Sequence, residues 1–82
     1  MSIIDQQQSY RIQVRGQLSP HWMSHFAGFH LRVSVEPDSS PGLVLSGIFK
    51  DQASLLGTLQ TLYNLGCTLV SVERLEAAPF QE

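Results

Sequence analysis

The sequence predicts an α+β domain built from four strands and two helices in the order βαββαβ. Four segments alternate apolar and polar residues with the two-residue period of a strand, and two segments repeat apolar residues at helical spacing. The helices follow the first and third strands, so each joins two parallel strands through a crossover. Only a short turn, PDSSP at 37–41, separates the second strand from the third, which predicts a hairpin. This combination is the ferredoxin-like split-βαβ plait, with strand order 4-1-3-2, both helices on one face of an antiparallel sheet and the other face open.

Length and composition narrow the class of protein. The chain has 82 residues, 43% of them hydrophobic, which predicts a single globular domain. We place this domain at 10–76, between a flexible amino terminus, 1–9, and a flexible tail, 77–82. The net charge of −2 argues against nucleic acid as a partner, and the single cysteine, Cys67, excludes a disulfide framework. There is no signal-peptide pattern and no run of about 18 apolar residues, so we expect a cytoplasmic protein that does not enter membranes.

The first half of the chain predicts a strand, a short helix and a second strand. In the first strand, 10–18, the series that faces the core is Tyr10, Ile12 and Val14, and the opposite series is Arg11, Gln13 and Arg15. Ser19-Pro20 suits a helix start, Trp22 and Phe26 form its buried stripe, and Gly28 is expected to end it in a left-handed conformation. The second strand, 29–36, is expected to bury Phe29, Leu31, Val33 and Val35.

The second half contains most of the strongly apolar positions. The third strand, 43–49, is apolar on both faces, with Leu43, Leu45 and Phe49 toward the core and Val44 and Ile48 toward the open face. Asp51 is expected to cap a long helix that ends at Gly66, and Gly57 is expected to allow close packing on the sheet. The apolar stripe of this helix is predicted to include Leu55, Leu56, Leu59, Leu62 and Tyr63. In the last strand, 67–74, we assign Val70 and Val72 to the core and Leu69 to the open face.

The open face is the predicted interface or ligand surface. Its candidate residues are Arg11, Arg15, His30, Arg32, Val44, Ser46, Ile48 and Leu69. The three arginines can be read as a platform for an anion or RNA. RNA-binding plaits place aromatic residues on the central strands, and these are missing here. We therefore expect the arginines to be solvated and paired with Glu36, Glu73 or a partner chain.

No catalytic, cofactor-binding or metal-binding residue is predicted. His21 and His25 have the i,i+4 spacing of a chelating pair, but a third ligand is not evident, so we interpret them as solvated histidines. Cys67 is interpreted as a small packed side chain.

Two sequence resemblances accompany this pattern. The start YRIQVRGQLSPHW, followed by LSG and DQASLLGTLQTLYNLGCTLVSVE, resembles a family of short, uncharacterised bacterial proteins. That family has a Y-x-I-x-V-x-G strand, a tryptophan-bearing helix, a D-Q-A-x-L helix and an L-G-x-x-L-x-S-V ending. The resemblance covers about residues 10–75 and implies no activity. The second half more loosely resembles ACT-type regulatory domains, whose glycine-rich turn after the first strand is missing here.

These observations predict a small non-enzymatic regulatory or interaction module that forms a homodimer and binds a protein or a small effector. We expect two open faces to pack together through Val44, Ile48 and Leu69, with arginines at the rim. One alternative is a dimeric plait enzyme of the monooxygenase or isomerase type, which requires an enclosed pocket with a histidine whose pKa is shifted. The other alternative is an RNA or phosphate binder.

Overall fold

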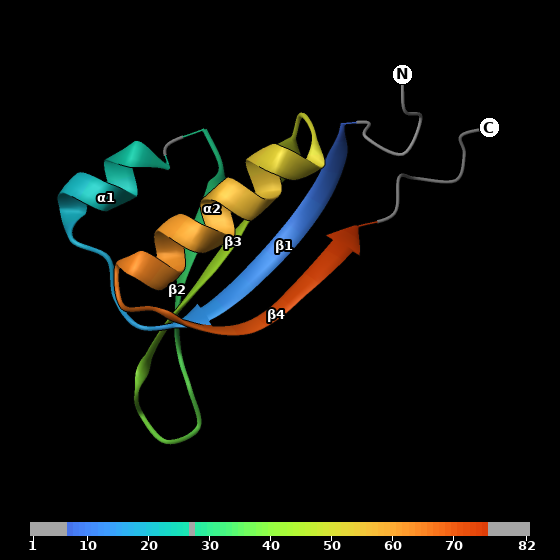
Figure 1. Cartoon of the computed structure of the whole chain (residues 1–82). Helices are drawn as coiled ribbons and strands as arrows, with labels where there is room; N and C mark the ends of the chain where they lie inside the picture. Colours follow the sequence, from blue (N-terminus) through green and yellow to red (C-terminus); the bar gives the residue numbers. More distant parts are fainter. Residues whose placement is uncertain (1–6, 27, 76–82) are drawn as a thin grey trace.

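Four strands form one antiparallel sheet, and two helices lie on one of its faces (Figure 1). The computed structural model describes residues 7–26 and 28–75. The elements in chain order are β1 Gln8–Arg15, α1 Pro20–His25, β2 His30–Val35, β3 Pro41–Phe49, α2 Gln52–Asn64 and β4 Thr68–Leu75. The predicted α+β class, with a four-stranded antiparallel sheet and two helices, is confirmed.

The strands lie in the order β2-β3-β1-β4, so β1 and β3 are central and β2 and β4 are edges. β1 pairs with β3 on one side and β4 on the other, and among the described strands β2 pairs only with β3. β1 begins at Gln8, two residues before the predicted domain boundary. The rest of the predicted flexible termini, residues 1–6 and 77–82, lies outside the described residues.

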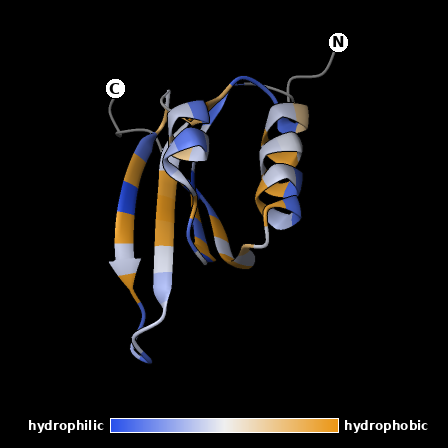
Figure 2. Cartoon of the chain, turned by 90° about the vertical axis from the view of Figure 1, so that its left-hand side faces the viewer, coloured by the Kyte–Doolittle hydropathy of each residue, from blue (hydrophilic) through white to orange (hydrophobic). Residues whose placement is uncertain are grey.

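The core lies between the sheet and the helices, which form the two layers seen in Figure 2. β1 follows the predicted alternation, because its inward residues are buried while Arg11 and Arg15 are exposed. Phe26 anchors α1, and Leu55 and Leu62 anchor α2. The buried cluster comprises Tyr10, Ile12, Val14, Phe26, Leu43, Leu45, Phe49, Leu55, Leu62 and Cys67.

Local sequence signals set the ends of α2. The Asp51 carboxylate accepts a hydrogen bond of 2.8 Å from the backbone N–H of Ser54, which satisfies one free donor of the first turn. This hydrogen bond also lowers the pKa of Asp51. Gly66 has a φ of 94°, so the predicted left-handed stop is confirmed. The same prediction for Gly28 is wrong, because among the described glycines only Gly16 and Gly66 have positive φ.

Several residues predicted to be buried are exposed. α1 has only six residues and leaves the hairpin end of β2 uncovered, so the inward assignment of Val33 and Val35 to the core is wrong. On α2, Leu56 is 63% exposed and Tyr63 is 73% exposed. The apolar stripe of α2 is therefore wider than the part of the helix surface that packs on the sheet.

The side chains of β4 are placed by an irregularity in its pairing with β1. The register shifts between Gln13 and Val14, so that Leu69 pairs with Val14, Ser71 pairs with Gln13, and Val70 is the extra residue of a β-bulge. Paired residues share a face, so Leu69 lies on the helix side and its assignment to the open face is wrong. Val70, which we assigned to the core, is 46% exposed. Val72 pairs with Ile12 and lies on the helix side, but it is 38% exposed, so its assignment to the core is also wrong.

Candidate functional site

The open face is organised as rows of side chains that run across the strands. Arg11 of β1 pairs with Ser46 of β3, and Ser46 pairs with His30 of β2. In the next row, Val44 of β3 lies between Gln13 and Arg32. The structure therefore brings most of the predicted open-face residues onto one surface.

The apolar cluster predicted for the open face does not form. Val44 is only 8% exposed and lies between its cross-strand neighbours Gln13 and Arg32, whose long side chains have apolar parts that can cover it. Ile48 is exposed, two residues beyond Ser46 along β3. Leu69 lies on the other face. A face-to-face dimer would thus have one exposed aliphatic side chain from the predicted trio, too little for an interface core.

Two of the three open-face arginines form ion pairs, as predicted. The guanidinium of Arg11 lies 3.0 Å from the carboxylate of Glu73. The guanidinium of Arg15 lies 3.1 Å from the carboxylate of Asp38 and 4.0 Å from that of Glu36. The Arg11 and Arg15 side chains are nearly half exposed, so these pairs orient side chains while contributing little to stability.

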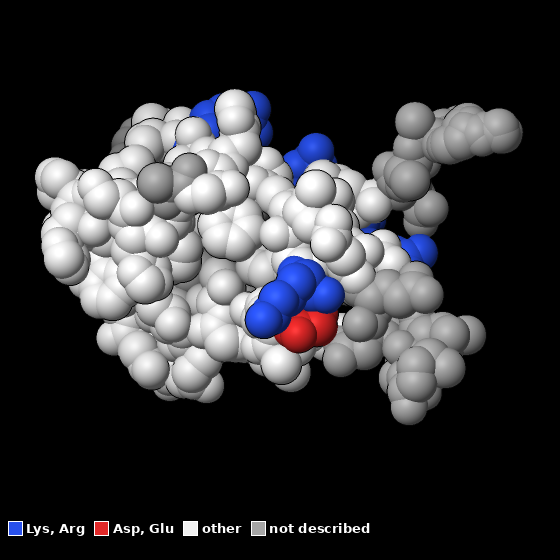
Figure 3. All heavy atoms as spheres, turned by 90° about the horizontal axis from the view of Figure 1, so that it is seen from above, with Lys and Arg blue, Asp and Glu red and all other residues white. Residues whose placement is uncertain are grey.

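Arg32 and His30 differ from the other basic residues of this face. Within residues 7–26 and 28–75, the side chain of neither residue makes an ion pair or a hydrogen bond. Together with Arg11, Val44 and Ser46 they line a hollow of about 150 Å³, which we call the open-face pocket. Figure 3 views the molecule from above and shows basic side chains along the upper edge of the picture, which is the side turned away from the helices.

A second surface, which the sequence did not predict, lies at the free edge of β4. Seven of the eight residues of β4 are exposed. Because α2 runs antiparallel to β4 and is right-handed, burial of Leu55 toward the sheet turns Leu56 and Tyr63 toward β4. We call this surface the β4–α2 edge. Its exposed apolar residues are Leu56, Tyr63, Leu69, Val70 and Val72. The two elements could be predicted separately, but their juxtaposition could not.

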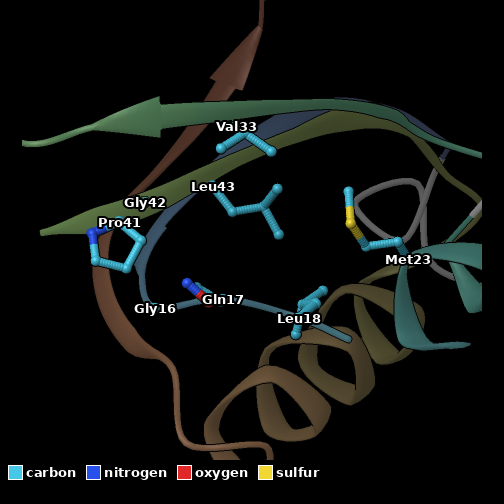
Figure 4. Close-up of a pocket in the computed structure, with 8 residues that line it drawn as sticks. All are labelled: Gly16, Gln17, Leu18, Met23, Val33, Pro41, Gly42 and Leu43. Carbon is cyan, nitrogen blue, oxygen red and sulfur yellow. The ribbon is translucent and has the colours of Figure 1, made fainter. Parts of the chain in front are cut away.

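A separate hollow, of about 180 Å³, lies between α1 and the hairpin end of the sheet (Figure 4). Leu18, Met23, Val33 and Leu43 surround it, and none of the residues that line it is ionisable. Its volume is below the roughly 300–1,000 Å³ of ligand pockets. It provides neither a general acid nor a general base, so it does not support the enzyme alternative.

The remaining chemical candidates have structural explanations. His21 and His25 are exposed, and their rings contact Trp22 edge-on at 5.7 and 5.0 Å between centroids. The described part of the chain contains no group of three His, Cys, Asp or Glu residues that could hold a metal ion. Cys67 is packed in the core, where desolvation raises the pKa of its thiol and so disfavours the reactive thiolate. Neither described helix is long and apolar enough to cross a membrane.

The fold and surfaces define a small α+β domain with an open sheet face and an uncovered apolar edge. The chain belongs to a family described as a domain of unknown function (DUF8691), whose model matches residues 9–73. No curated protein and no solved structure matched the chain. The expected membership of an uncharacterised family is thereby confirmed.

Proposed function

We propose that this protein is a non-enzymatic homodimeric interaction module, with the β4–α2 edge as its dimer interface. The observation that carries the proposal is that β4, an edge strand, presents exposed apolar side chains beside an exposed apolar flank of α2. We also propose that the fold is a ferredoxin-like plait, because the strand order read from β4 is 4-1-3-2. An ACT-like regulatory role and a cytoplasmic location remain proposals of the same kind.

The backbone of β4 supports pairing with another strand. Among the described residues β4 pairs with β1 along one side only, so the other side of β4 presents N–H and C=O groups without a strand partner there. The second edge strand, β2, is less suited to self-association, because it begins at the exposed His30 and carries Arg32 with no acidic residue in the strand to oppose it. An added strand at β4 would continue the sheet without disturbing the core.

The side chains of the β4–α2 edge favour a second copy of the chain as the occupant. Burial of a large aliphatic or aromatic side chain is worth about 1.5–3 kcal/mol, and the edge presents Leu56, Tyr63 and Val72 together. In a two-fold dimer whose sheets are continuous, α2 of each copy lies next to α2 of the other. The exposed flanks of α2 then cover one another, which a single added peptide strand would not achieve.

The charges of β4 are compatible with self-pairing. In antiparallel pairing around Val72, Val72 meets its own copy, Ser71 meets Glu73 and Val70 meets Arg74. No two like charges are directly opposed in this register, and like charges so placed are destabilising. The edge is therefore self-complementary, as a two-fold interface requires.

Light scattering on matched variants tests this proposal. Wild type is expected to be a dimer at high micromolar concentration, and Leu56→Asp is expected to be a folded monomer, because Leu56 is exposed within one copy. Ile48→Asp is the control, since Ile48 is an equally exposed apolar residue on the open face. A monomeric wild type would refute the proposal. Dissociation by Ile48→Asp but not by Leu56→Asp would move the interface to the open face.

A further inference from the structure

We propose that the open-face pocket binds the phosphoryl group of a small molecule through Arg11, His30, Arg32 and Ser46. The proposal does not depend on dimer formation, because the β4–α2 edge lies at the free side of β4 whereas these residues come from β1, β2 and β3. It extends the proposed function by naming the chemical class of effector.

The sheet register places the four polar side chains in one small area. Arg11, Ser46 and His30 stand in a single row across three adjacent strands, and Arg32 is two residues from His30 on the same side of β2. All four line the same hollow, whose apolar base is Val44. Strands hold their side chains more rigidly than loops do, so these donors are positioned before a ligand arrives.

The pocket has donors available for an anion. The side chains of Arg32 and His30 make no ion pair or hydrogen bond with the described residues and both are exposed, so their N–H groups face solvent. The hydrogen bond from Arg11 to Glu73 uses Nη1, and a guanidinium carries five N–H donors in all. Ser46 adds a hydroxyl donor. The pocket therefore offers donors on opposite sides without breaking the Arg11–Glu73 pair.

The size and chemistry of the pocket favour a phosphoryl group over a larger ligand. Its volume of about 150 Å³ is half or less of the roughly 300–1,000 Å³ typical of pockets that enclose whole ligands. Two guanidinium groups match the oxygens of a phosphoryl group with charge-assisted hydrogen bonds. No Phe, Tyr or Trp lines the pocket, so it lacks the large aromatic platform on which nucleobases typically stack. The small anionic group is thus the part of the effector that this surface recognises.

Amide chemical-shift titration with inorganic phosphate tests the site, with sodium chloride holding the ionic strength constant. We expect saturable shifts centred on Arg11, His30, Arg32 and Ser46. Arg32→Gln is expected to weaken binding about tenfold, because it removes a charged hydrogen-bond donor. Glu73→Gln is expected to strengthen binding, because it removes the carboxylate that competes for Arg11.

Two comparisons make the test specific. Arg15→Gln is the matched control, since Arg15 lies on the same face but does not line the pocket, and it is expected to change affinity less than twofold. Acetate, a planar carboxylate, is expected to bind more weakly than phosphate. Shifts that fail to saturate, equal losses in Arg32→Gln and Arg15→Gln, or acetate binding as tight as phosphate binding would each overturn the proposal. The Leu56→Asp variant is expected to bind phosphate like wild type, so failure of the dimer proposal and failure of this site are distinguishable.

Discussion

At the scale of single residues, two glycines have different roles: Gly47 is required by side-chain packing, whereas Gly57 only lowers the helix propensity of α2. Gly47 belongs to the inward series of β3, where a side chain would be expected. The ring of Phe29 fills that space instead, and it stacks on Phe49 with 4.7 Å between the ring centroids. A Cβ at Gly47 would lie 2.5 Å from the Phe29 ring. The aromatic pair therefore depends on a glycine that the alternation of the strand does not explain.

Gly47→Ala is expected to destabilise the protein by roughly 1–3 kcal/mol, because the Phe29 ring must move out of its packed position. Denaturant unfolding followed by circular dichroism measures this loss. A change below about 0.5 kcal/mol would show that the ring has room to shift.

Gly57→Ala is expected to have the opposite effect. Gly57 lies inside α2, is exposed, and an added Cβ would meet no atom within 4 Å, so our expectation that it allows close packing on the sheet is wrong. Alanine there restricts the unfolded chain and favours the helix, with an expected gain of about 0.5–1 kcal/mol. The same unfolding experiment checks this, and a loss of stability would contradict the exposed position of Gly57.

The turn between β2 and β3 contains a carboxyl group with a shifted pKa. Hydrogen bonds from the hydroxyl and backbone N–H of Ser40, followed by the interaction with Arg15, lower the pKa of Asp38 from 3.8 to about 2. Because the folded-state pKa is depressed, the contribution of Asp38 to stability is present above pH 3.8 and is lost as pH falls toward 2.

An NMR titration of Asp38 is expected to show a midpoint near 2 in the wild type. Ser40→Ala is expected to raise that pKa more than Arg15→Gln does, since the hydrogen bond from the Ser40 hydroxyl, which alanine removes, is the largest single cause. A larger rise in Arg15→Gln would show that charge, rather than the turn, sets the pKa.

At the scale of elements, α2 has one apolar face that is buried in the core and a second that is exposed. Leu62 is 2% exposed and faces the core, whereas Leu56 is one of the residues of the β4–α2 edge. The sequence pattern predicts that both residues belong to one buried stripe. For Leu56 this prediction is wrong, because its side chain is exposed within a single copy.

Leu62→Ala is expected to cost about 2–5 kcal/mol, because it leaves a cavity under α2. Leu56→Ala is expected to cost less than about 0.5 kcal/mol at concentrations where the chain is monomeric, because the side chain is already in contact with water. Denaturant unfolding of both variants decides between the faces, and equal losses would mean that Leu56 is buried after all.

At the scale of the whole molecule, association and stability are linked. If the β4–α2 edge joins two copies, the folded dimer is favoured by mass action as concentration rises. The thermal unfolding midpoint of the wild type is therefore expected to increase with protein concentration, whereas that of Leu56→Asp is expected to stay constant. Differential scanning calorimetry at several concentrations measures this. A midpoint that does not change in the wild type would argue that the edge stays free.

The sequence alone determined the elements, because their signals are local. Alternation defined the strands, the carboxylate of Asp51 and the glycine at 66 bounded α2, and the inward series of β1 is buried as predicted. The polar members of the open-face pocket were also predicted to share a face, since residues two apart on a strand point the same way.

Only the tertiary structure decided which apolar residues are covered and where β4 places its side chains. Periodicity shows which residues can be buried together, but burial also requires another element to reach them. α1 is too short to cover Val33, and nothing in the described chain covers the flank of α2 at Leu56. The bulge at Val70 forms only in the pairing of β4 with β1, and this bulge places Leu69 on the helix side. Register and coverage are relations between distant segments, and no local pattern determines them.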